Sequence, residues 1–287
     1  MTQWEWSGWT ALWAGEDDED LSLVLREVRK QRTAKTQQAW ARDPLTRGFC
    51  DLGAYSLYQH HLSGGIPFTG VPEMTLFPNM GAEHLMKLAA TVVPDTWLAG
   101  GLNRQRYVDT WAHHHSYITD LITYIFRSAP TLRRVQSMTG EFVQAASDLS
   151  FGELIRVAAQ AEIESALNDP ILSLQALLQA ALPRQPKIQA AVRKIEQEML
   201  TEWTTLYEKV LTGYGLSLRP GVTARDMAEL FDTMIEGVLL RARSGGSIPV
   251  VSTGQDIFTA SLLVMLPALC DVPLAELERR KLQHPLR

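Results

Sequence analysis

The chain has 287 residues, of which 46% are hydrophobic, and a formal net charge of −5 at pH 7. This length provides for one large domain or two small ones, with ample apolar side chains for a core. No apolar run reaches the roughly 18–20 residues that a membrane span requires, and the opening MTQWEWSGW lacks the pattern of a secretory signal. A dedicated nucleic-acid-binding domain is usually basic, so the charge restricts any DNA contact to a local surface.

The two cysteines, Cys50 and Cys270, are far apart in the sequence and fit no metal-ligand spacing. Unpaired thiols in a reducing cytoplasm are the expectation. The first 20 residues combine four tryptophans with the acidic run EDDED, the tryptophans being Trp4, Trp6, Trp9 and Trp13. Exposed indoles favour aggregation, so this N-terminal arm either docks on the body of the protein or covers a ligand or partner.

A helix is predicted from Asp20 to Arg42, because Leu21, Val24, Leu25 and Val28 have helical spacing. Its second half is the most basic stretch of the chain. Such a face is either simply solvated or suited to phosphate contacts. The candidate DNA-binding residues are therefore Arg26, Arg29, Lys30, Arg32 and Lys35.

Two further helices are expected, over 46–62 and 81–93. Between them, the stretch IPFTGVPEMTLFPN contains three prolines and a glycine, which excludes a long helix. A long helix is then predicted from Asn103 to about Arg127. It contains His113, His114 and His115, which point about 100° apart on a helix and so cannot chelate one ion together. His114 lies near the centre of the apolar stripe and is either a core histidine or a polar group in a ligand pocket.

Residues 128–139 are expected to be a connection around Pro130. Helices follow over 142–149, 151–167, 171–182 and 187–211, and no segment shows the alternation of a strand. The predicted fold class is therefore all-α, a multi-helix bundle. Glu162 and Glu164 lie on a polar side of their helix and are expected to be solvated. The tail from Asp271 to Arg287 is expected to add a short helix and to fray.

The best-specified helix is predicted over 223–243. Thr223 and Asp226 have the spacing of a capping box, arginines occupy the last turn, and Ser244-Gly245-Gly246 follows. A second helix, over about 253–269, is apolar almost all round and needs cover on every side. A second copy of the chain would cover both helices. The predicted dimer-interface residues are Phe231, Met234, Ile235, Val238, Phe258, Leu262 and Met265.

The run from Gly213 to Arg243, with Leu-Arg-Pro-Gly at 218–221 opening the helix, resembles the C-terminal region of tetracycline-repressor-like (TetR) regulators. In that family the last two helices of each subunit form a four-helix dimer interface. The resemblance covers roughly residues 100–270 and implies three parts. They are an N-terminal Trp/acidic arm with the basic helix (1–44), a small region like a degenerate helix-turn-helix (45–100), and a ligand-binding and dimerisation domain (101–287).

The N-terminal match is atypical. Thr46–His61 looks like the first helix of the family, and residues 76–80 look like its Phe-containing turn, with Met80 where a lysine is usual. The stretch between them is too broken for a normal recognition helix. The resemblance also implies a pocket within each subunit, whose lining would suit an apolar or aromatic effector. Projected onto this chain, the ligand-binding residues are Trp111, His114, Ile118, Phe151, Ile155, Met199 and Trp203.

The sequence contains no nucleotide-binding loop, no serine elbow and no metal-binding knuckle, so neither a cofactor, a metal nor an enzyme is predicted. The resemblance implies a cytoplasmic, homodimeric transcriptional regulator that responds to a small apolar or aromatic effector and binds a DNA operator. The alternatives are a sensor or protein-binding dimer without direct DNA binding and, less favoured, an enzyme on a helical scaffold.

Overall fold

The computed structural model describes residues 20–29, 32–63, 76–77, 80–94 and 97–286. Within these residues the fold is all-α, as predicted, and the only β pairing is an isolated bridge between Val250 and Asp256. None of the helices in this part of the chain is long and apolar enough to cross a membrane. The Trp-rich arm, Lys30 and most of the Pro/Gly-rich stretch lie outside the described residues.

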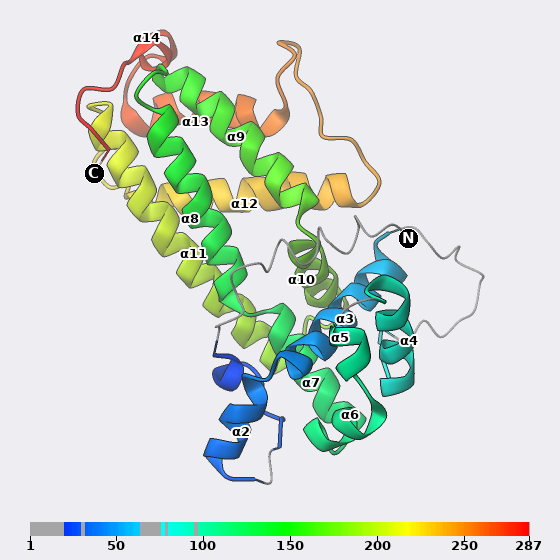
Figure 1. The fold of residues 1–287 in the computed structure, drawn as a ribbon. Helices are drawn as coiled ribbons and strands as arrows, with labels where there is room; N and C mark the ends of the chain where they lie inside the picture. The colour runs from blue at the N-terminus through cyan, green and yellow to red at the C-terminus, as the bar shows by residue number, and fades with distance from the viewer. Residues whose placement is uncertain (1–19, 30–31, 64–75, 78–79, 95–96, 287) are drawn as a thin grey trace. The chain divides into compact units, whose positions relative to one another are not determined.

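The chain forms two compact units, each assembled from two separate stretches of sequence (Figure 1). The first comprises Met1–Pro130 and Pro170–Arg193, and the second comprises Thr131–Asp169 and Lys194–Arg287. The domain boundaries predicted at residues 44 and 100 both fall within the first unit.

The first unit is organised around α3 (Pro44–His61), which is buried on nearly all sides between Gly48 and Leu57. A helix buried all round lies at the centre of its unit, and α3 contacts every helix around it. These are α2 (Ala34–Ala41), α4 (Ala82–Val92), α5 (Trp97–Gly101), α6 (Arg104–Thr110), α7 (His114–Ile125) and α10 (Pro170–Ala181).

The close approach of α7 to α3 depends on Gly53, because a Cβ there would collide with the hydroxyl of Tyr117. That hydroxyl donates a hydrogen bond to the carbonyl of Phe49 at 2.9 Å. Two turns along α7, the hydroxyl of Tyr124 donates to Asp51 at 2.7 Å. Buried tyrosines generally need such partners, so these two bonds fix α7 against α3.

The helix predicted over 20–42 is wrong. A 3₁₀ turn, η1 (Leu21–Leu23), is followed by non-helical residues at 24–29 and 32–33, and α2 begins only after its N-cap, Thr33. Arg29 adopts the left-handed region with φ 46°, which ends a right-handed helix. The backbone N–H of Arg29 donates to the carbonyl of Thr110 at 3.0 Å, and that of Glu27 donates to Asp120. These bonds to distant segments replace the local helical ones.

The single helix predicted over 103–127 is also wrong, because the chain breaks at Trp111–His113 into α6 and α7. Trp111 and His113 both have extended backbone. The break allows the indole N–H of Trp111 to donate to Asp120 at 2.9 Å. Conversely, the expected connection at 128–139 is helical, within α8 (Ser128–Ala145). Pro130 lies in the first turn of α8, where its missing N–H has no helical partner to lose.

The second unit contains most of α8, together with α9 (Phe151–Asn168), α12 (Ala224–Arg243), α13 (Ile257–Cys270), α14 (Leu274–Arg279) and the larger part of α11 (Pro186–Gly213). Helix α9 contacts α12, α13 and α14, and α12 contacts α13. The predicted capping box of α12 is confirmed, since the backbone N–H of Asp226 donates to Thr223 at 3.1 Å and that of Thr223 donates back at 2.8 Å.

The predicted short helix of the tail is confirmed as α14, but the prediction that the tail frays is wrong. The backbone N–H of Gln283 donates to the carbonyl of Gly213 at 2.7 Å, and the Arg280 guanidinium donates to the carbonyl of Gly215 at 2.8 Å. The end of the chain is thereby anchored to the end of α11, where exposed carbonyls need partners.

Candidate ligand-binding site

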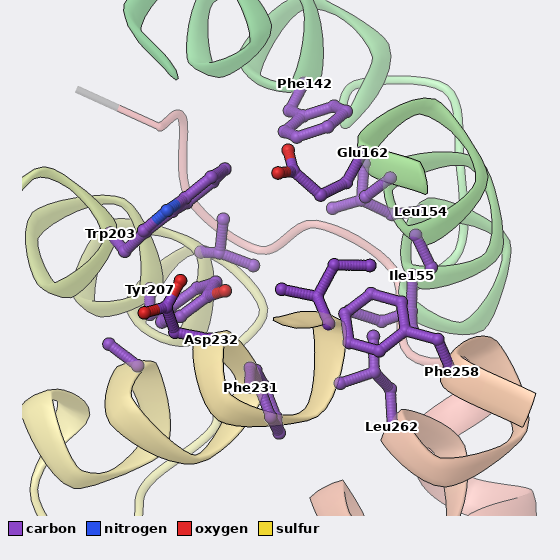
Figure 2. Close-up of a pocket in the computed structure, with 15 residues that line it drawn as sticks. Phe142, Leu154, Ile155, Glu162, Trp203, Tyr207, Phe231, Asp232, Phe258 and Leu262 are labelled. Carbon is purple, nitrogen blue, oxygen red and sulfur yellow. The ribbon is translucent and has the colours of Figure 1, made fainter. Parts of the chain in front are cut away.

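An apolar cavity lies within the second unit, bounded by α8, α9, α11, α12 and α13 (Figure 2). Its volume is about 90 Å³, whereas one water needs only about 10–15 Å³. Most of its lining is aliphatic or aromatic, with two carboxyl groups among the apolar side chains. The lining residues are Phe142, Leu154, Ile155, Ala158, Ala159, Glu162, Trp203, Tyr207, Val210, Ala228, Phe231, Asp232, Ile235, Phe258 and Leu262.

The helical repeat places these side chains on one face of each helix. On α12, Ala228, Phe231, Asp232 and Ile235 recur at intervals of three and four residues, and the capping box fixes where the helix begins. Alanines contribute from both α9 and α12. Because an alanine fills little volume, the space between the larger side chains stays open.

Three aromatic residues form one wall. Trp203 and Tyr207, one turn apart on α11, are stacked with ring centroids 5.9 Å apart. The ring of Phe231 meets that of Tyr207 edge to face at 5.7 Å. Offset-stacked and edge-to-face arrangements are the favoured geometries of aromatic pairs. The wall is therefore a packed surface that presents ring area to the cavity.

Glu162 brings one carboxyl group to the cavity, and Figure 2 shows it next to Phe142. One of its oxygens accepts a hydrogen bond from the guanidinium of Arg134 at 3.2 Å. The other, Oε2, is buried without a hydrogen-bond partner in the described part of the chain. A buried acceptor without a partner is costly, so this oxygen is a candidate contact for a ligand donor.

Asp232 brings the second carboxyl group, beside the ring of Tyr207 in Figure 2. Burial raises the pKa of Asp232 to about 7, and the negative charges of Glu236, Glu162 and Glu196 add to the rise. No hydrogen bond within the described residues engages the Asp232 carboxyl, the Tyr207 hydroxyl or the Trp203 indole N–H, but the described lining atom that is both buried and without a partner is Oε2 of Glu162.

The predicted ligand-binding residues are divided between the units. Ile155 and Trp203 line the cavity. Phe151 and Met199 belong to the second unit but are not part of its lining, and Phe151 instead packs against Tyr214 with ring centroids 5.2 Å apart. The remaining three, Trp111, His114 and Ile118, belong to the first unit.

Trp111 lies in a filled aromatic cluster of the first unit. It is 1% exposed, and the rings of Phe49, Tyr107 and Tyr117 surround it with centroids 5.9, 5.6 and 5.0 Å away. Its indole N–H is bonded to Asp120. His114, in contrast, is exposed at the first residue of α7, so the expectation of a histidine at the centre of an apolar stripe is wrong. The break at Trp111–His113 removes the stripe on which that expectation depended.

Sequence reasoning missed Glu162, Tyr207 and Asp232. The expectation that Glu162 is solvated is wrong, because its side chain is only 14% exposed. A usable signal exists on α12, where Asp232 borders the apolar stripe and is followed four residues later by Glu236. Like charges at this spacing destabilise an isolated helix. The pair therefore indicates that negative charge at this position has a function other than stabilising the helix.

Four of the predicted dimer-interface residues, Phe231, Ile235, Phe258 and Leu262, are buried within the chain and line the cavity. The other three, Met234, Val238 and Met265, are half-buried. The same two helices also carry Leu240, which is 65% exposed, and Val264, which is 70% exposed. Each helix therefore has a face toward the cavity and apolar side chains that the chain itself leaves uncovered.

The predicted DNA-binding residues do not share one helix. Arg29 lies 3.6 Å from Asp109, and its guanidinium lies 4.3 Å from the centre of the Trp40 ring. Arg26, Arg32 and Lys35 are exposed, and only Lys35 is on a helix, α2. Arg29 and Arg32 also line a polar pocket of about 280 Å³, together with Glu27 and Asp109 and with His113 and His115, which are stacked at 5.4 Å.

Among the residues that the structure describes, no three histidine, cysteine, aspartate or glutamate side chains gather closely enough to hold a metal ion. Both cysteines are free and buried. No protein-family model, curated protein or solved structure matches this chain.

Proposed function

We propose that this protein is a ligand-responsive regulator of the TetR type, and that its effector is a small, mainly apolar or aromatic compound bound in the cavity of the second unit. The observation that carries the proposal is the cavity itself: apolar and aromatic walls around two carboxyl groups, one of which has a buried oxygen without a hydrogen-bond partner in the described chain. Small-molecule sites in proteins have this composition. An ordinary core would be filled at close to crystalline density and would satisfy its polar groups.

Two helices that line the cavity, α12 and α13, would connect ligand binding to the proposed dimer interface. Phe231 and Ile235 of α12 and Phe258 and Leu262 of α13 face the cavity, while Leu240 and Val264 of the same helices are exposed. In the proposed homodimer, α12 and α13 of each subunit pack against their counterparts. A ligand that shifts these helices then changes the dimer geometry, provided that it binds the two geometries with different affinities.

Ligand binding is tested by thermal unfolding in the presence of small aromatic compounds. A compound that binds only the folded state and is supplied at 100 times its dissociation constant stabilises that state by about 2.7 kcal/mol. The matched variant is Ala228→Phe, which fills the cavity from α12, and it should lose the stabilisation. The control is Ala181→Phe at the exposed end of α10 in the first unit, which should retain it. An absence of any stabilisation across apolar and aromatic compounds would contradict the proposal.

Dimerisation is tested by sedimentation. Met234→Asp places a charge on the half-buried side of α12 and, in a symmetric interface, does so twice. The wild-type chain should sediment as a dimer at micromolar concentration, and the variant as a monomer. A monomeric wild type would remove the dimer from the proposal without affecting the cavity.

The second candidate function is a sensor of the same ligand that does not bind an operator directly. It is favoured by the geometry of residues 26–29 and 32–33, which are not helical, and by Arg29, which is engaged by Asp109 and Trp40. The test is binding to the DNA upstream of the coding region across salt concentrations. Replacing Arg26, Arg32 and Lys35 together by Ala spares Arg29 and should lower the slope of log affinity against log salt by about 0.9 per lost phosphate contact. A wild type without affinity at low salt supports the sensor.

A further inference from the structure

The charge around the cavity is predominantly negative. Asp232 and Glu162 line it, and the charges of Glu236 and Glu196 act on Asp232 from α12 and α11. Arg134 of α8 opposes them, and it already donates to Glu162 and lies 3.9 Å from Asp169. More carboxyl groups than cations surround this partly buried cavity. Such an excess of negative charge is unfavourable unless a further positive charge binds beside the carboxyl groups.

The hydrogen-bonding groups at the cavity also indicate the charge of the ligand that would bind there. The Oε2 atom of Glu162 is a buried acceptor without a donor, and the Asp232 carboxyl has no hydrogen bond within the described chain. Ionised carboxyls only accept, so the missing group must donate. The adjacent rings of Trp203 and Tyr207 stabilise a cation close to their faces.

We propose that the effector is a protonated amine on a small apolar or aromatic body, with Asp232 as the counter-ion of its ammonium group and Glu162 as a second acceptor. This inference rests on the proposed function, because it names the chemical class of the ligand that the cavity takes. An ammonium donor forms charge-assisted hydrogen bonds with the carboxyls, and the apolar body occupies the space among Phe231, Phe258 and Leu262. Anionic compounds of the same size are repelled by the same carboxyls.

The test compares benzylamine with benzyl alcohol and benzoate, three probes that share a phenyl ring and differ in charge. Their dissociation constants are measured by NMR titration of the full-length wild-type chain at pH 8, where Asp232 is ionised. Benzylamine should bind on the order of 10- to 100-fold more tightly than benzyl alcohol, the range of a hydrogen bond to a charged group. Benzoate should bind more weakly than either.

The matched variants are Asp232→Asn and Glu229→Gln, each of which removes one carboxylate from α12. Glu229 is exposed and paired with Arg225, and it does not line the cavity. Asp232→Asn should remove about tenfold or more of the preference for benzylamine and leave benzyl alcohol binding within about twofold. Glu229→Gln should change neither.

The outcomes distinguish failure of the amine inference from failure of the ligand site. If benzyl alcohol and benzylamine bind equally well to the wild type, the amine inference fails and the cavity remains a ligand site. If the preference for benzylamine survives in Asp232→Asn, the assignment of the counter-ion is wrong. If none of the probes binds, both the amine inference and the ligand site in the second unit are overturned.

Discussion

Each unit contains a tryptophan and a buried or partly buried aspartate, and the two pairs differ in how their polar atoms are used. In the first unit, the Trp111 indole donates to Asp120 at 2.9 Å, and the backbone N–H of Glu27 donates to the same carboxyl at 3.0 Å. In the second unit, Trp203 and Asp232 both face a cavity, and neither has a hydrogen-bond partner in the described chain.

Burial raises the pKa of both carboxyls, that of Asp120 to about 6 and that of Asp232 to about 7. In Asp120 the hydrogen bonds from Glu27 and Trp111 counteract this rise, whereas in Asp232 the neighbouring acids reinforce it. A raised pKa is therefore common to both units and does not by itself identify a site. The difference in hydrogen bonding separates a carboxyl that holds the core from one that is available to a ligand.

The largest expected effect distinguishes the two tryptophans. Trp111→Ala should lower the free energy of unfolding by about 3–5 kcal/mol, because it empties a filled aromatic cluster. Trp203→Ala should lower it by only about 1–3 kcal/mol, because part of the Trp203 surface already faces empty space and has fewer contacts to lose. Urea unfolding followed by circular dichroism measures both values. Equal losses would mean that Trp203 is as well packed as Trp111.

The second prediction concerns the carboxyl of the cavity. A folded-state pKa of about 7 for Asp232 means that the folded protein binds more protons than the unfolded chain between about pH 4 and 7. The contribution of this group to stability is therefore fully present below pH 4 and is lost as the pH rises through 7. At pH 8, Asp232→Asn should raise the free energy of unfolding by about 2–4 kcal/mol, and at pH 4 it should change it little.

The groups that face Asp232 are Glu236 on its own helix, Glu162 on α9, Glu196 and Tyr207 on α11, and Arg134 on α8. Glu229→Gln is again the control, and as a change at a surface pair it should alter the free energy of unfolding by less than about 0.5 kcal/mol. A destabilised Asp232→Asn at pH 8 would show that the carboxylate has a favourable partner within the protein.

The third prediction compares the two carboxyls at pH 4, where both are protonated in the folded state. Asp120→Asn should cost about 1–3 kcal/mol, because both oxygens of the protonated carboxyl can accept from Trp111 and Glu27, whereas the N–H₂ group of the amide cannot accept. Asp232→Asn should cost less than about 0.5 kcal/mol at this pH, since there is no hydrogen bond to lose. Similar costs for both substitutions would contradict the distinction between the two regions.

The sequence predicted the parts of the fold that local signals determine. The start of α12 follows from Thr223 and Asp226, and its end precedes Gly245, which has a φ of 79°. The break between α6 and α7 was not predictable in this way, because it depends on bonds from Trp111 to Asp120 and from Arg29 to Thr110. Such bonds join segments whose proximity is known only from the folded chain.

The candidate site was predictable to a similar extent. Ile155 and Trp203 were placed in a pocket by the family resemblance, and both line the cavity. Glu162 and Asp232 were not, because a carboxyl beside an apolar stripe is usually solvated. Only the positions of α8, α11 and α12 around Glu162 show that its second oxygen is buried.

The most direct test of the central claim, that the cavity of the second unit is a ligand site, is a crystal structure with 4-bromobenzylamine. The anomalous scattering of bromine locates the compound independently of any assumption about its pose. We expect a bromine peak among Phe231, Phe258 and Leu262, with the ammonium group directed to Asp232. A bromine peak elsewhere, or a cavity closed by its own side chains with no bromine in it, would show that the cavity is not a ligand site.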